Sequence, residues 1–169
     1  IGLGIATDRP LEHRLQRAAT LPDGPEVWDA AVATSFDATL SAIRAFDRPV
    51  HWVGGGRSKQ PERILEPAAA ELPESGIATA HVFGEIAPTL AATLTGRVTT
   101  TRHATLEDAL DAARSAARAG EVLLFSPAFA SFDQFVNYRQ RAAAFRAWVA
   151  RAMEQERPPT GAGCQDDDS

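Results

Sequence analysis

The chain has 169 residues, of which 44% are hydrophobic and 23% are charged, and its formal net charge is -5. This length and composition are typical of one globular domain and exclude a chain that is disordered throughout. The acidic balance argues against nucleic-acid binding, because neutralising phosphates requires a basic face. No run of residues predicts a membrane-spanning helix. The single cysteine, Cys164, excludes a disulfide framework and a cysteine-based zinc site, and favours a cytoplasmic location.

The ends of the chain differ in composition from its middle. The chain begins at Ile1 rather than Met, so we expect it to be a piece of a longer protein. Residues 1–9 are rich in glycine and are expected to be a linker or the end of a preceding domain. Residues 10–156 form the predicted domain. Residues 157–169 contain adjacent prolines and an aspartate run, which together predict a disordered acidic tail.

The first predicted elements surround a turn. The sequence Leu-Pro-Asp-Gly at 21–24 is a turn signal, and plausible strands at 11–19 and 25–32 flank it. Ser35 is expected to cap the next helix, because its hydroxyl can accept a hydrogen bond from a free backbone N–H group. Apolar residues at helical spacing then predict that this helix covers about 36–46.

Strands and helices alternate through the rest of the chain. Further strands are predicted at 50–53, 77–83, 98–101 and 121–125. Helices are predicted to begin near Pro61, Ile86, Thr105 and, for the longest one, Ser131. Residues 121–125 are nearly all apolar, as in a central parallel strand that is covered on both faces. The alternation predicts an α/β fold with a doubly wound, mostly parallel sheet and helices on both faces.

Two loops follow strands at the edge where such sheets bind ligands. Residues 54–59, Gly-Gly-Gly-Arg-Ser-Lys, end at Lys59, the only lysine among 17 basic residues. This loop lacks the Walker A pattern, so it is either a tight turn or an anion site. In the second loop, 126–134, Ser131 and Gln134 match a capping box. The free N–H groups of a helix start suit a carboxylate or phosphate, although an ordinary helix cap explains the same residues.

Histidine and cysteine do not indicate a catalytic or metal site. The four histidines are dispersed without metal-ligand spacing, and no Gly-x-Ser-x-Gly motif occurs. His51 and His81 fall in predicted strands, where core or edge positions explain them better than a ligand role. We therefore expect neither a catalytic residue nor a metal ligand within this chain.

The second loop resembles a known signature. The sequence Leu-Leu-Phe-Ser-Pro-Ala-Phe-Ala-Ser-Phe-Asp-Gln-Phe-Val-Asn-Tyr at 123–138, followed by Arg141 and Phe145, closely resembles that of Mur ligases. Among them it is most similar to the members that add D-glutamate. Further segments that agree in order and spacing are 10–14, 33–39 and 55–59. The resemblance covers roughly residues 8–155.

This resemblance implies a domain type and a reaction. Mur ligases have three domains, and the chain resembles the third, a Rossmann-like domain that binds the incoming amino acid and closes over ATP. The N-terminal domain for the UDP-sugar and the central ATPase domain, with its Mg²⁺ site, are expected elsewhere in the same protein. In the family, ATP phosphorylates a carboxylate, here of UDP-N-acetylmuramoyl-L-alanine. The nitrogen of D-glutamate then attacks the acyl phosphate to form an amide of a peptidoglycan precursor, so the chain alone is expected to be inactive.

Roles in amino-acid binding follow from the resemblance at matching positions. Lys59 matches a lysine that pairs with a carboxylate of D-glutamate, and Thr34 matches a threonine near the α-carboxylate. Ser131 and the start of the following helix match a cradle for the side-chain carboxylate. Tyr138 stands where the family has an aromatic residue at that cradle.

The nucleotide side departs from the family pattern. The resemblance implies ATP contacts from Arg14 and the adjacent His13. However, the family's Asp-Ser-Lys-Ala-Thr segment aligns with 30–34, so Ala30 replaces an aspartate that holds the ribose and Val32 replaces a lysine that faces the phosphates. We therefore expect the parent to be either a weakened or divergent ligase or a non-catalytic paralogue with a binding or regulatory role. A folate-polyglutamylating ligase is a third alternative, which the close signature match disfavours.

Overall fold

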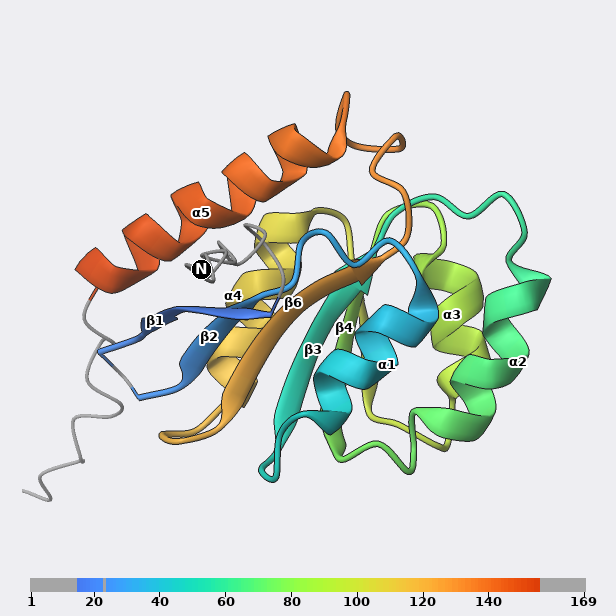
Figure 1. The fold of residues 1–169 in the computed structure, drawn as a ribbon, viewed down its shortest axis with the longest axis horizontal. Helices are drawn as coiled ribbons and strands as arrows, with labels where there is room; N and C mark the ends of the chain where they lie inside the picture. Colours follow the sequence, from blue (N-terminus) through green and yellow to red (C-terminus); the bar gives the residue numbers. More distant parts are fainter. Residues whose placement is uncertain (1–14, 23, 156–169) are drawn as a thin grey trace, which may run out of the picture.

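The computed structural model describes residues 15–22 and 24–155. Within them, six strands form one sheet in the order β1-β2-β6-β3-β4-β5 (Figure 1). The strands are β1 (Gln16–Thr20), β2 (Glu26–Asp29), β3 (Val50–Gly55), β4 (Ile77–Phe83), β5 (Thr100–His103) and β6 (Val122–Ala128). The helices are α1 (Phe36–Arg44), α2 (Glu62–Glu71), α3 (Ala87–Leu94), α4 (Leu106–Ala116) and α5 (Tyr138–Glu154). β1 pairs with β2 antiparallel, and the other pairs are parallel.

β6 lies inside the sheet because its sequence suits burial on both faces. All of its residues are buried, and it pairs with β2 on one side and β3 on the other. The strand predicted at 121–125 is confirmed, and the structure extends it to Ala128. The alternating strands and helices give the predicted doubly wound, mostly parallel α/β fold, which is Rossmann-like.

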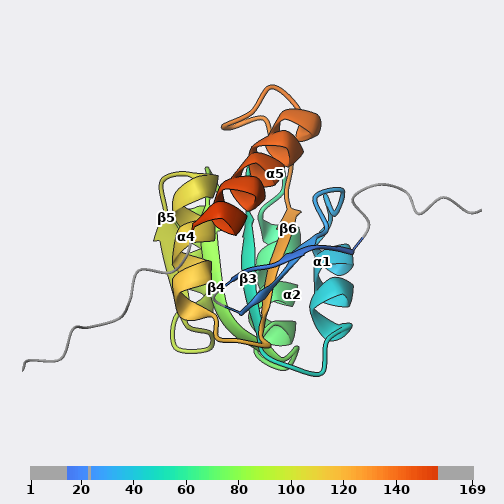
Figure 2. The same cartoon turned by 90° about the vertical axis from the view of Figure 1, so that its left-hand side faces the viewer.

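Helices cover both faces of the sheet, and neighbouring residues of each strand supply the two cores. Side chains alternate along a strand. Trp52 and Leu124 therefore pack with α1, α2 and α3, whereas Val53 and Leu123 pack with α4 and α5. Figures 1 and 2 show the same division, with α1–α3 on one side of the sheet and α4 and α5 on the other.

Other predicted strands also have different bounds in the structure, and the strand predicted at 50–53 continues to Gly55 as β3. β2 stops at Asp29, because its Oδ1 accepts a hydrogen bond from Ala31 N–H (2.8 Å) and the chain turns there. β5 covers Thr100–His103 instead of 98–101. The predicted strand at 11–19 lies partly outside the described residues, and β1 covers Gln16–Thr20.

The last helix begins later than predicted. α5 starts at Tyr138, and Asn137 is its N-cap, with Oδ1 accepting a hydrogen bond from Gln140 N–H (3.0 Å). The Gln140 side chain in turn accepts one from Val136 N–H (2.7 Å). The helix cap is therefore the Asn-x-x-Gln pattern at 137–140, and the prediction of a cap at Ser131 is wrong. Both patterns satisfy the same sequence rule, so the rule alone did not separate them.

Candidate functional site

Loops from four strands meet at the carboxyl edge of the sheet. Arg57 N–H, in the loop after β3, donates to Ala130 O in the loop after β6 (2.9 Å). Ala128 N–H, at the end of β6, donates to Ala33 O in the loop after β2 (3.0 Å). The N–H of Gly56 bonds to the last carbonyl of β4 (3.3 Å). These backbone bonds fix the loops that carry the predicted amino-acid-binding residues.

Gly56 is needed where the loops after β3 and β6 touch. Its φ is +135°, and a Cβ atom added there would lie 2.2 Å from Ala130 O. Only glycine fits both the backbone conformation and the contact. The glycine-rich sequence thus serves a tight turn, and the same turn presents Lys59 beyond it.

Lys59 and Thr34 are both accessible at this edge. The side chain of Lys59 is exposed in the bend before α2, and it makes no hydrogen bond or ion pair with the residues that the structure describes. Thr34 is exposed immediately before α1, whose N-cap Ser35 accepts a hydrogen bond from Ala38 N–H (3.3 Å). The predicted cap at Ser35 is confirmed, and both predicted ligand-binding side chains face solvent.

Ser131 is buried in a loop rather than at a helix start. It is 3% exposed, and its carbonyl accepts a hydrogen bond from Phe135 N–H (2.9 Å). The part of the prediction that used the free N–H groups of a helix at Ser131 is therefore wrong. Ser131 nevertheless follows Ala130, which contacts the glycine loop, so it lies at the same edge of the sheet as Lys59.

Tyr138 opens α5 with an exposed side chain. It is 45% exposed, its hydroxyl accepts a hydrogen bond from Arg139 Nε (3.3 Å), and the guanidinium of Arg139 lies 5.8 Å from its ring centre. An exposed aromatic ring can stack on a ligand, and here the ring lies next to the guanidinium of Arg139. The predicted ATP-binding residues His13 and Arg14 lie outside the described residues.

The loop after β2 does not supply the nucleotide contacts that the family pattern has. Ala30 is 4% exposed, and its N–H donates to Phe125 O (2.8 Å). Val32 is 40% exposed and offers an apolar surface where a lysine is expected. Neither side chain therefore carries a polar group at these two positions. The described residues also contain no group of three or more His, Cys, Asp or Glu side chains placed to hold a metal ion.

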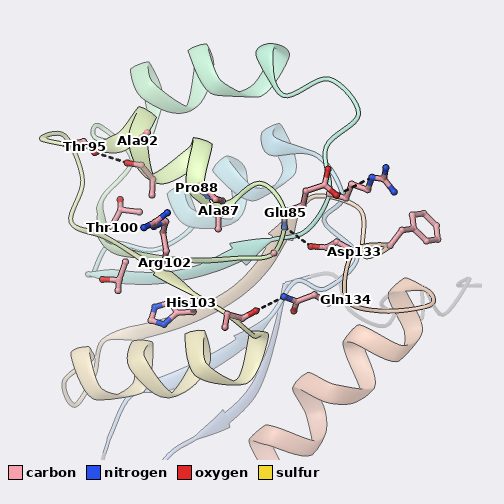
Figure 3. Close-up of a pocket in the computed structure, with 16 residues that line it drawn as sticks. Glu85, Ala87, Pro88, Ala92, Thr95, Thr100, Arg102, His103, Asp133 and Gln134 are labelled. Carbon is pink, nitrogen blue, oxygen red and sulfur yellow. Dashed lines mark hydrogen bonds and ion pairs between the residues drawn. The ribbon is translucent and has the colours of Figure 1, made fainter.

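A groove of about 1250 Å³ lies beside the site, between α3, β5 and the loop after β6 (Figure 3). Asp133 Oδ2 accepts a hydrogen bond from Glu85 N–H (2.9 Å), and Glu85 pairs with Arg57 (3.4 Å). Gln134 Nε2 donates to Ala104 O (2.7 Å). None of the predicted D-glutamate-binding residues lines this groove. Asp133 stands in the signature, but no local pattern predicts its role, because its partner is a backbone group distant in the chain.

Comparison with known proteins finds curated relatives of the chain. The chain is 38% identical over 136 residues to the UDP-N-acetylmuramoylalanine–D-glutamate ligase of Desulfatibacillum aliphaticivorans, covering 80% of this chain and 29% of that protein. It is 39% identical over 145 residues to the ligase of that name from Nitratidesulfovibrio vulgaris, covering 86% of this chain and 33% of that protein. The chain thus spans about a third of the length of these curated relatives.

A solved structure has the same fold. A murein peptide ligase from Psychrobacter arcticus superposes with a TM-score of 0.57 at 12% identity, over 87% of this chain and 31% of that one. No protein-family model matches the chain. In the described part of the chain, no helix has the length and apolar character needed to cross a membrane.

Proposed function

The chain corresponds to the C-terminal domain of the Mur ligase family, to which it belongs, and from this premise we propose that it binds D-glutamate. The full-length protein would be an ATP-dependent ligase that forms an amide bond in peptidoglycan precursor synthesis. UDP-N-acetylmuramoyl-L-alanine, ATP and Mg²⁺ would be bound mainly by other domains of the protein. We propose residues 10–156 as the boundaries of this domain, 157–169 as an acidic tail, and the cytoplasm as its location. On this proposal, the 169-residue chain alone forms no amide.

The observation that supports this proposal best is the shared position of three loops. Lys59, Ser131 and Thr34 come from the loops after β3, β6 and β2, which backbone hydrogen bonds hold at one edge of the sheet. An ammonium group pairs with a carboxylate through charge-assisted hydrogen bonds. An amino acid with two carboxylates suits this arrangement, in which Lys59 and Thr34 lie at the surface and Ser131 lies beneath it. With both carboxylates held, the amine of D-glutamate is the group left to react.

Substitution of Lys59 tests the proposal directly. In the full-length protein, we expect Lys59→Ala to raise KM for D-glutamate roughly ten- to a hundredfold, since a charge-assisted pair contributes about 1.5–3 kcal/mol. KM for ATP should stay nearly constant. Lys59→Arg should restore little, because a planar guanidinium differs in size and geometry from an ammonium. Arg63→Ala is the matched control, since Arg63 is an exposed cation of α2. An unchanged KM for D-glutamate in Lys59→Ala contradicts the assignment.

A second candidate function is a non-catalytic, binding or regulatory paralogue. The observation that favours it is the loss of polar side chains at Ala30 and Val32, where the structure shows a buried methyl group and an apolar surface. The test is ATP affinity of the full-length protein, with and without Val32→Lys. Tight ATP binding and turnover by the unmodified protein would favour the ligase, and absence of both would favour the paralogue. A P-loop sequence upstream of Ile1 would support the ligase before any assay.

A further inference from the structure

Arg141 is buried in a way that packing alone does not explain. It lies in the first turn of α5 and has an exposed fraction of 0%. Its Nη1 donates hydrogen bonds to Phe129 O (2.8 Å) and Gly55 O (3.5 Å). Its Nε and Nη2 are buried without a hydrogen-bond partner among the described residues. A buried guanidinium with unpaired N–H groups lowers stability, so some other benefit must accompany it.

The two carbonyls that Arg141 contacts belong to the two site loops. Gly55 is the last residue of β3 and leads into the loop that ends at Lys59. Phe129 directly follows β6 and precedes Ser131. Through one nitrogen atom, Arg141 therefore joins the backbones that carry two proposed carboxylate-binding residues, and it does so from a third element, α5.

Asp133 supplies a negative charge near this guanidinium. Burial lowers the pKa of Arg141 to about 10, while the charge of Asp133 acts to raise it, so Arg141 is protonated at neutral pH. Asp133 Oδ2 is held by Glu85 N–H (2.9 Å), and its Oδ1 is buried without a partner among the described residues. A Cβ atom at Gly84 would lie 2.1 Å from Oδ2, so a glycine makes room for this carboxylate. The charge of Arg141 is thus partly balanced from the loop that it holds.

We propose that Arg141 is a positioning residue, which sets the spacing of Lys59 and Ser131 by holding the carbonyls of Gly55 and Phe129. The inference rests on the proposed function only where it concerns D-glutamate. A guanidinium suits this task better than an ammonium, because the two N–H groups of Nη1 lie in fixed directions in the guanidinium plane. Arg141 itself is fully buried, so it acts through the loops rather than by contact with the amino acid.

The experiment compares Arg141→Met, Arg141→Lys and a control, Arg146→Met, in the full-length protein. Arg146 is exposed on the same helix. We expect Arg141→Met to raise KM for D-glutamate roughly tenfold or more while KM for ATP changes less than about twofold. Arg141→Lys should fall between Met and the unmodified protein, and Arg146→Met should behave like the latter.

Amide hydrogen exchange at Arg57 gives a second readout that needs no turnover. This N–H bonds to Ala130 O across the two loops (2.9 Å), so it should exchange faster in Arg141→Met, and less so in Arg141→Lys, while amides of the β3–β4 pairing keep their protection. A uniform loss of protection in folded variants would mean a merely structural role.

If Arg141→Met does not fold, Arg141→Lys decides: unchanged exchange at Arg57 together with unchanged KM for D-glutamate overturns the proposal. If Arg141→Met speeds exchange at Arg57 but Lys59→Ala leaves KM for D-glutamate unchanged, Arg141 does position the loops and the assignment of the D-glutamate site is wrong.

Discussion

We predict that the chain loses stability as the pH falls from about 6.5 to 4, and that His81 causes most of the loss. His81 is 5% exposed on β4. Its Nε2 shares a hydrogen bond with Thr79 Oγ1 (2.9 Å), and its Nδ1 shares one with His103 Nε2 (3.2 Å). Burial, and then the charges of His103 and His51, lower the pKa of His81 from 6.5 to about 4. The unfolded chain therefore binds a proton at a higher pH than the folded chain does, so acid favours unfolding.

The size of the effect follows from the two pKa values. With 6.5 for the unfolded state and about 4 for the folded state, the loss relative to pH 8 is about 1.4 kcal/mol at pH 5.5 and about 2.5 kcal/mol at pH 4.5. His103 acts in the same direction, because burial lowers its pKa as well. The hydrogen bond from Arg48 lowers the pKa of Glu26. Burial acts to raise the pKa of Glu121, but hydrogen bonds from Arg118 N–H and the His51 ring outweigh it and lower this pKa. The stability that these two carboxylates contribute is therefore lost at the acid end of this range and below it.

Urea unfolding at pH 8, 5.5 and 4.5 measures this loss in the unmodified chain and in His81→Gln. A glutamine amide can donate and accept hydrogen bonds without titrating, so the free energy of unfolding of His81→Gln should change much less between pH 8 and 5.5. The reasoning is refuted if His81→Gln loses as much stability over this range as the unmodified chain, or if the unmodified chain loses none.

Two further predictions concern the site loops and the last helix. Gly56→Ala should lower the free energy of unfolding by more than about 2 kcal/mol, because the added Cβ would lie 2.2 Å from Ala130 O. Gly76→Ala is the control: this glycine also has a positive φ, but no atom lies within 4 Å of its added Cβ, so the loss should be smaller. Equal losses in urea unfolding would contradict the steric argument. Asn137→Ala should cost about 1 kcal/mol through the lost N-cap. The helical circular dichroism signal should also fall slightly, whereas no change in stability would show that the cap is unimportant.

Local patterns predicted most of the fold because each strand and helix is marked by its own sequence. The apolar run at 121–125 identified the inner strand, and Ser35 and Thr105 identified helix starts that the structure confirms through hydrogen bonds to Ala38 and Asp108. These signals depend on neighbours in the chain. They could not identify the start of α5, because the patterns at Ser131 and Asn137 are equivalent until tertiary contacts choose between them.

The contacts of Asp133 and Arg141 could not be predicted for the same reason. Asp133 bonds to the backbone of Glu85, and Arg141 bonds to Gly55, both of which are distant in sequence. A charged residue in the signature gives no sign that it will be buried. The position of the Lys59 loop was predictable, since the carboxyl ends of parallel strands share one edge of a sheet, but its attachment to the loop after β6 required the structure.

In the loop after β2, the two positions that depart from the family pattern, Ala30 and Val32, differ in exposure and therefore in what a substitution there can restore. Val32 is 40% exposed, so a lysine at this position keeps its ammonium in water and should leave the fold intact. Ala30 is 4% exposed, so an aspartate there would be desolvated unless the loop moves. On the proposed function, we therefore expect the exposed substitution Val32→Lys to add a phosphate contact, whereas a ribose contact at residue 30 would require rearrangement of a buried turn. If Val32→Lys strengthens ATP binding in the full-length protein and Ala30→Asp lowers its stability, the two departures differ physically: residue 32 is an exposed position that a lysine can occupy, and residue 30 is a packed position that an aspartate cannot occupy without a change of the turn.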